Sequence, residues 1–265
     1  MGKREVSQGR GRGSKTGGLV PIMDTPTVVR PTSFSPMNDT QRRYMATIAA
    51  NQLTFGDGPA GTGKTYVAAS MAAEALRDGL VNRIVVTRPN VEAGNPMGFL
   101  PGELEEKFAP FLEPVREIFE ERLGKSFVEY ALEHGKIVVR PLSYMRGHTF
   151  KNAFVLFDEA QNATPREMYL FLTRIGENAK VVVDGDPHQQ DIPGASGFTD
   201  AIQRMMGTKS VAHFTFSDDD IVRSGLVREV ILKYRTDNDT RPVVPANFEP
   251  PAFLTPVIPL RAANG

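Results

Sequence analysis

The sequence predicts a single α/β domain between residues 37 and 235, built on a mainly parallel sheet that helices cover on both faces. Two observations lead to this expectation. Short apolar runs alternate along the chain with segments of helical periodicity, the order typical of strands joined by crossover helices. Runs such as V-V-V at residues 181–183 are apolar on both faces, as parallel strands covered by helices must be.

The expected elements begin with a helix over residues 38–51, where apolar side chains recur at helical spacing. A second helix over residues 64–77 is expected to stop near Gly79. The apolar runs between the helices predict the strands. The expected strands cover residues 53–55, 83–87, 137–140, 154–157, 180–183 and 211–216.

Two further signals place the remaining helices. Thr164 and Glu167 form a capping box around Pro165, so a helix is expected to begin there. Proline inside a helix removes a hydrogen bond and clashes with the preceding turn. The remaining helices are expected over residues 103–123, with a bend at Pro110 or Pro114, and over residues 225–234.

The two ends of the chain differ from this core. Residues 1–36 contain the basic run G-R-G-R-G and several prolines, and residues 236–265 are rich in proline. Segments of this composition bury too little apolar surface to order themselves, so both are expected to be flexible tails. The basic character of the first tail favours non-specific contact with a polyanion.

Composition excludes several classes of function. Lys plus Arg and Asp plus Glu are both 31, so no basic field covers the whole chain. The chain has no Cys, which excludes disulfides, thiol nucleophiles and Cys-ligated zinc, and only 4 His. The longest apolar run, residues 153–157, is far below the roughly 18 residues of a membrane span. No secretory signal is seen, so a cytoplasmic protein without a membrane partner is expected.

The strongest motif is G-P-A-G-T-G-K-T at residues 58–65, which fits the phosphate-binding pattern G-x-x-x-x-G-K-[ST] between a strand and a helix. Its backbone N–H groups would bind phosphate oxygens, with Lys64 on the β- and γ-phosphates and Thr65 on Mg²⁺. The alternative is an accidental Gly-rich turn. The candidate nucleotide-binding residues are Gly58, Pro59, Ala60, Gly61, Thr62, Gly63, Lys64 and Thr65.

Two more polar sequences follow buried strands. Residues 154–161 read F-V-L-F-D-E-A-Q, in which Asp158 would hold Mg²⁺ and Glu159 would polarise the attacking water. Residues 181–189 read V-V-V-D-G-D-P-H-Q, in which Gln189 would sense the γ-phosphate and Asp186 would contribute to the Mg²⁺ shell. The alternatives are a solvated loop acid for Asp158 and an ordinary turn for the second motif.

Together these three motifs resemble motifs I, II and III of superfamily 1 helicases. More closely, the chain is similar to the PhoH family of phosphate-starvation-associated ATPases of bacteria and phages, over about residues 38–234. The blocks that carry this resemblance are T-R-P-N-V-E-A-G-N-P-M-G-F-L-P-G (87–102), R-P-L-S-Y-M-R-G-H-T-F (140–150), F-L-T-R-I-G (171–176) and G-D-P-H-Q-Q-D-I-P (185–193). The resemblance implies a RecA-like ATPase core that hydrolyses ATP with Mg²⁺, often as a ring and with a proposed link to RNA.

The resemblance also implies roles for single residues. Gln41 matches the glutamine that reads the adenine edge, although a surface-helix glutamine is the competing interpretation. Arg88, in T-R-P, matches a motif that contacts single-stranded nucleic acid, and a structural ion pair is its alternative. Arg146 is a second candidate for this contact. It is followed by Gly147-His148 where the family usually has Gly-Arg, which weakens the expected contact.

Phosphoryl transfer often needs an arginine finger, and the chain is too short for the second domain that supplies it in helicases. The finger must then come from within the core or from a neighbouring subunit, and the family resemblance implies a homo-oligomeric ring of six. The main candidates are Arg174 and Arg223, and Arg146 or no finger at all is the remaining alternative. Three functions therefore compete. They are a helicase-like ATPase acting on single-stranded RNA or DNA, an ATP-gated scaffold with slow hydrolysis, and a P-loop kinase.

Overall fold

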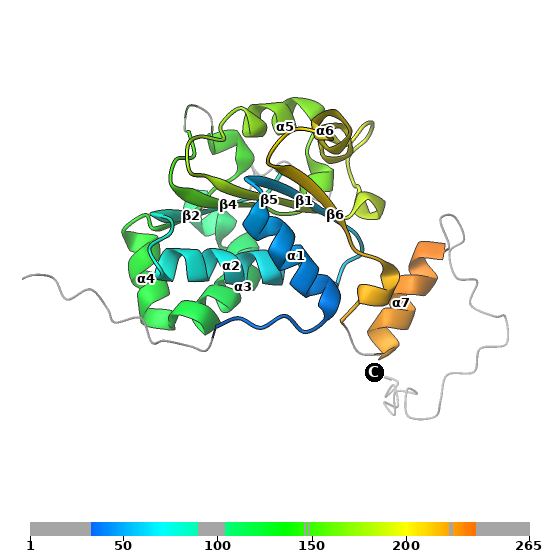
Figure 1. Cartoon of the computed structure of the whole chain (residues 1–265), viewed down its shortest axis with the longest axis horizontal. Coiled ribbons are helices and arrows are strands. Elements are labelled where there is room, and N and C mark those ends of the chain that lie inside the picture. The colour runs from blue at the N-terminus through cyan, green and yellow to red at the C-terminus, as the bar shows by residue number, and fades with distance from the viewer. Residues whose placement is uncertain (1–32, 90–103, 146, 148, 223–224, 237–265) are drawn as a thin grey trace, which may run out of the picture.

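The structure is a computed structural model that describes residues 33–89, 104–145, 147, 149–222 and 225–236 (Figure 1). Apart from residues 33–36 and 236, the two expected tails lie outside the described residues. Among the helices that the structure describes, none is both long enough and apolar enough to cross a membrane.

A six-stranded sheet forms the centre of the molecule, and every pairing between its strands is parallel. Its strand order is β3-β2-β4-β5-β1-β6. This arrangement confirms the predicted parallel sheet and all six predicted strands. The strands are β1 (Leu53–Asp57), β2 (Arg83–Thr87), β3 (Ile137–Val139), β4 (Ala153–Phe157), β5 (Lys180–Gly185) and β6 (Val211–Thr215).

Helices cover both faces of the sheet, as predicted (Figure 1). One face carries α1 (Asp39–Ala50), α2 (Lys64–Arg77), α3 (Leu104–Leu123) and α4 (Lys125–Glu133). The other face carries α5 (Pro165–Leu172) and α6 (Gly197–Met205), and α7 (Gly225–Thr236) follows β6 near the end of the described chain. The 3₁₀ turns are η2 (Leu142–Met145), η3 (Ala160–Asn162), η4 (Pro187–Gln189) and η5 (Asp218–Asp220).

Local sequence signals account for the starts of two helices. Asn38 caps α1, and the predicted capping box of Thr164 and Glu167 begins α5. The structure has one helix across Pro110 and Pro114, where a bend was expected. Two helices were not predicted, α4 and α6, each of 9 residues.

The core has two layers of aromatic and aliphatic side chains, one on each face of the sheet. Tyr44 and Phe119 are fully buried on the face of α1 to α4, and Phe157 and Phe198 are buried on the other. Full burial of one such side chain stabilises the fold by about 1.5–3 kcal/mol. Strands β1, β5 and β4 lie between these layers, so their carboxyl ends are held rigidly at one edge of the sheet.

Candidate nucleotide-binding site

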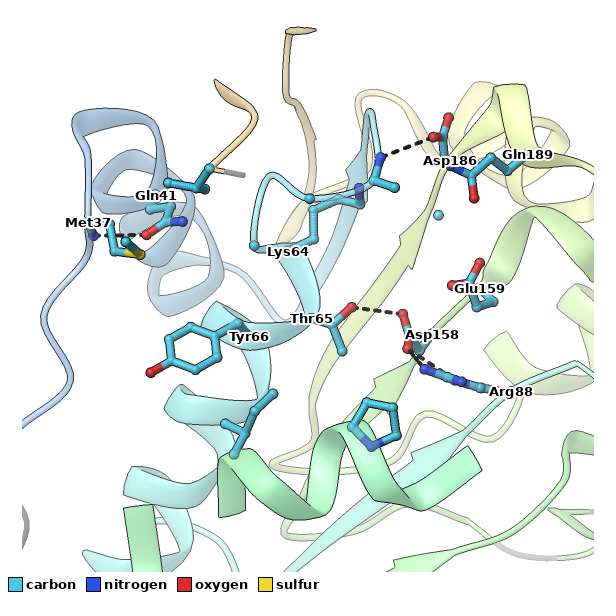
Figure 2. Close-up of a pocket in the computed structure, with 17 residues that line it drawn as sticks. Met37, Gln41, Lys64, Thr65, Tyr66, Arg88, Asp158, Glu159, Asp186 and Gln189 are labelled. Carbon is cyan, nitrogen blue, oxygen red and sulfur yellow. Dashed lines mark hydrogen bonds and ion pairs between the residues drawn. The ribbon is translucent and has the colours of Figure 1, made fainter. Parts of the chain in front are cut away.

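A cavity of about 450 Å³ lies at the carboxyl ends of β1, β4 and β5 (Figure 2). Clefts of this size and position are the usual ligand sites of parallel α/β sheets. All three sequence motifs contribute to its lining. The lining residues that carry polar side chains are Gln41, Lys64, Thr65, Tyr66, Arg88, Asp158, Glu159, Asp186 and Gln189.

The Gly-rich loop joins β1 to α2 in the conformation that its sequence predicts. Gly61 and Gly63 have φ values of 84° and 87°, a left-handed backbone that favours glycine. Gly63 is the N-cap of α2, so the free N–H groups and the positive end of the helix dipole face the loop. A Cβ at Gly63 would lie 2.6 Å from the Gln41 Nε2 atom. The loop thus has the concave backbone that phosphate binding requires.

Lys64 extends back over this loop. Its Nζ donates to the carbonyl oxygens of Gly58, at 2.7 Å, and Pro59, at 2.9 Å. Burial lowers the pKa of the Lys64 ammonium from its usual value. Four carboxylates act in the opposite direction and favour the charged form: Asp184, Asp186, Asp158 and Glu159.

The predicted pair Thr65 and Asp158 is in direct contact. The Thr65 Oγ1 hydroxyl donates to Asp158 Oδ1 at 3.0 Å. Arg88 contacts the other carboxylate oxygen, with its Nε 3.1 Å from Oδ2 and its Nη2 in an ion pair with the same atom. The ion-pair alternative for Arg88 is therefore present in the structure, whereas its contact with nucleic acid stays a prediction.

A hydroxyl and a carboxylate are the hard oxygen ligands that Mg²⁺ prefers, so this donor set fits the ion. In the part of the chain that the structure describes, no three His, Cys, Asp or Glu side chains cluster as a metal cage. Mg²⁺ is usually held by one or two carboxylates together with water and substrate phosphates, and Asp158 can supply one such carboxylate.

Glu159 follows Asp158 in a left-handed conformation, with φ 55°, and its side chain is exposed. Its Oε2 accepts a hydrogen bond of 2.7 Å from Gln161 Nε2. The same Gln161 side chain, which is buried, donates to the Gln189 carbonyl at 3.3 Å and accepts from the Asp186 N–H at 3.1 Å. Gln161 therefore links the ends of β4 and β5. Sequence reasoning gave it no role, although its place after two carboxylates at a strand end was a usable signal.

The two predicted residues after β5 have different surroundings. Both oxygens of Asp186 accept backbone hydrogen bonds, Oδ2 from Ala60 at 3.2 Å and Oδ1 from His188 at 3.0 Å. Asp186 thus connects β5 to the Gly-rich loop, and its role in the Mg²⁺ shell stays a prediction. Gln189 is exposed at the edge of the cavity, and its contact with the γ-phosphate likewise stays a prediction.

Gln41 is 1% exposed, so the alternative of a surface-helix glutamine is wrong. Its Oε1 accepts from the Met37 N–H at 2.9 Å (Figure 2). Its Nε2 donates to the Thr62 carbonyl at 3.1 Å. Gln41 therefore fastens the start of α1 to the Gly-rich loop. It also lines the cavity, where its contact with adenine stays a prediction.

A buried pair of polar side chains, missed by sequence reasoning, lies next to β1. The Tyr44 hydroxyl donates to Asp184 across Gly56, where any Cβ would overlap both groups. Burial raises the pKa of Asp184 to about 7, and the Asp158 charge adds to the rise, while the Tyr44 hydrogen bond opposes it. Burial also raises the pKa of Tyr44 well above its usual value.

None of the arginines expected as the finger is among the described residues that line the cavity around Lys64. Arg174 lines a separate cavity of about 50 Å³ between α5 and η2, so it is no part of the cavity around Lys64 in its own subunit. Arg146 and Arg223 lie outside the described residues. The residue before Arg223 is fixed, because the Val222 N–H donates to the Gly61 carbonyl at 2.9 Å.

Comparison with known proteins agrees with the motifs. A family model described as PhoH-like protein matches residues 33–235. Protein PhoH of Escherichia coli K12 is 46% identical over 201 residues, which cover 74% of this chain and 57% of that protein. The PhoH-like protein of Bacillus subtilis is 44% identical over 200 residues, which cover 75% of this chain and 63% of that protein. The chain thus spans about three-fifths of the length of these relatives.

Among solved structures, the large terminase from a thermophilic bacteriophage, in complex with ADP, aligns with 77% of this chain and 51% of its own. The sequence identity is 14% and the TM-score is 0.45.

Proposed function

The chain belongs to the PhoH family, and on that premise we propose that it binds Mg·ATP and hydrolyses it to ADP and phosphate. The observation that carries the proposal is the hydrogen bond between Thr65 and Asp158 in one cavity with Lys64. It joins the phosphate-binding loop to the carboxylate of a second strand, which is the arrangement that phosphoryl transfer requires.

Each residue then has a chemical task. The loop N–H groups and Lys64 would hold the β- and γ-phosphates, and Lys64 would exchange its loop carbonyls for phosphate oxygens. Mg²⁺, bound by Thr65 and Asp158, would neutralise part of the triphosphate charge. Glu159, oriented by Gln161, would accept a proton from the attacking water.

The reaction is an in-line displacement at the γ-phosphorus. A bond forms between the water oxygen and this phosphorus, and the bond from phosphorus to the β,γ-bridging oxygen breaks with its electron pair leaving on ADP. The water proton passes to the Glu159 carboxylate and then to solvent. The products are ADP and inorganic phosphate.

Phosphate release by the purified chain tests this proposal directly. We expect Lys64→Ala to abolish nucleotide binding, and Glu159→Gln to bind ATP but lose about 10²–10⁴-fold in turnover, because general base catalysis is removed. Lys209→Ala, an exposed lysine that is no part of the cavity lining, is the matched control. Unchanged hydrolysis in Glu159→Gln would refute the assigned base.

We further propose that the ATPase assembles as a homo-oligomeric ring and binds single-stranded RNA or DNA. Exposed apolar side chains on α7, Leu226, Val227 and Val230, support assembly through this helix. The basic run in the first 20 residues supports phosphate contacts that weaken as salt rises.

Hydrolysis measured with and without poly-U RNA, together with the mass of the particle in solution, tests these two features. Stimulation by poly-U supports the strand-binding proposal. An active monomer would refute the ring, and hydrolysis indifferent to poly-U would favour an ATP-gated scaffold.

A further inference from the structure

Two cationic side chains line the nucleotide cavity among the residues that the structure describes, Lys64 and Arg88. We propose that Arg88 is a catalytic residue that supplies, within its own subunit, the arginine charge that hydrolysis needs. This inference rests on the proposed ATPase function. Of the two sources that the sequence left open, the core and a neighbouring subunit, it selects the core, at the end of β2.

The backbone around Arg88 is held on both sides. The Thr87 carbonyl accepts from the Asp158 N–H at 3.0 Å, and the Arg88 carbonyl accepts from the Leu142 N–H at 3.3 Å. Arg88 therefore occupies a fixed place between the ends of β3 and β4, and its side chain is only 18% exposed. A catalytic arginine gains from such anchoring, because little of its freedom is left to lose when it binds phosphate.

The contacts of Arg88 leave it able to change partner. Among the described residues, both hydrogen bonds of the Arg88 side chain go to one oxygen, Asp158 Oδ2, while Oδ1 accepts from Thr65 (Figure 2). Asp158 is also the carboxylate that fits Mg²⁺. A guanidinium and a divalent cation would compete for it, so Arg88 would turn from Asp158 towards phosphate oxygens in the cavity that it already lines.

The charges of the cavity favour this exchange. Three carboxylates line it, those of Asp158, Glu159 and Asp186, and burial lowers the pKa of Lys64. A triphosphate adds further negative charge, most of all on the leaving oxygens as the γ-phosphate transfers. The guanidinium of Arg88 stays protonated at every working pH and binds two phosphate oxygens at once.

The test compares Arg88→Ala and Arg88→Lys with the unchanged chain. We expect Arg88→Ala to lower kcat about 10³-fold or more, the size of an arginine-finger effect. Calorimetry gives a second readout. The affinity of Arg88→Ala for Mg·ADP should stay within threefold of that of the unchanged chain. Aluminium fluoride mimics the transferring phosphate, and the affinity that it adds to Mg·ADP binding should be lost in this variant. Arg88→Lys should restore less than a tenth of kcat, because a lysine lacks the planar fork. Arg83→Ala, exposed at the other end of β2, is the matched control.

Hydrolysis by the unchanged chain tests the proposed function, and the variants test Arg88 separately. The proposal is overturned if Arg88→Ala hydrolyses ATP at a rate within threefold of that of the unchanged chain. If this variant loses only its stimulation by poly-U, Arg88 belongs to strand binding, and the proposal is overturned as well. Loss of Mg·ADP binding in both Arg88 variants would make the residue a structural partner of Asp158. Activity regained on mixing Arg88→Ala with Lys64→Ala would place the arginine in trans and overturn the proposal as well.

Discussion

Replacing Asp184 with asparagine should make the protein more stable above neutral pH. Asp184 is fully buried, and its proton is retained in the folded state to about pH 7. In the unfolded chain the same carboxyl loses its proton near pH 3.8. Between these values the folded state binds more protons than the unfolded state, so the free energy of unfolding decreases as pH rises.

The magnitude follows from the difference between the two pKa values. A rise of about 3 in pKa corresponds to on the order of 4 kcal/mol of stability lost as pH rises from about 3 to about 8, of which roughly half is lost between pH 5 and pH 7. Asp184→Asn has no charge to bury, and its amide oxygen still accepts the Tyr44 hydroxyl. Its stability should therefore lack this decline and exceed that of the unchanged chain at pH 8.

Urea unfolding at pH 5, 6, 7 and 8, without nucleotide, measures the effect. The free energy gained by Asp184→Asn should grow by about 2 kcal/mol from pH 5 to pH 7 and by less than about 0.5 kcal/mol from pH 7 to pH 8. Asp191→Asn, an exposed carboxyl, is the control and should show no such trend. A gain that is the same at all four pH values would refute a buried carboxyl with a raised pKa.

Three other changes test the site. Thr65→Ala should raise the Mg²⁺ concentration needed for half-maximal hydrolysis at least about tenfold, because it removes both a ligand and a hydrogen bond to Asp158; an unchanged Mg²⁺ titration contradicts the assigned ligand. Gln161→Ala should lower kcat about 10–100-fold with little change in ATP affinity measured by calorimetry, since it orients Glu159; an unaltered kcat would contradict this role. Gly63→Ala should lower the melting temperature more than Gly79→Ala does, because both positions have positive φ but only Gly63 is close to Gln41; equal melting temperatures would show that this contact costs nothing.

The strands and the Gly-rich loop could be predicted because their signals are local. A β-branched apolar run such as residues 181–183 is typical of a strand covered on both faces, and the spacing of glycines around Lys64 reflects backbone requirements within eight residues. Helix α6 was missed because it begins at Gly197, a weak helix former. Glycine is needed at this position because of a tertiary contact, since a Cβ on residue 197 would overlap the Thr164 backbone.

Contacts between distant parts of the chain could not be predicted in the same way. Tyr44 and Asp184 are 140 residues apart, and Arg88 and Asp158 are 70 apart. A single sequence contains no local signal that identifies the contact partner of a buried side chain. Gln161 lay inside a recognised motif, but its function as a link depends on the packing of β4 beside β5, which brings the Asp186 N–H within hydrogen-bond distance.

The hydrogen bonds of the Gly-rich loop connect the site to several elements of the fold. The loop is fastened to α1 through Gln41, to the end of β5 through Asp186, and to the segment before α7 through Val222. Each of these bonds ends on a different loop residue, so the backbone is held at three consecutive positions, Ala60, Gly61 and Thr62. Because the fold holds the loop in place, little of its freedom is left to lose when a phosphate binds.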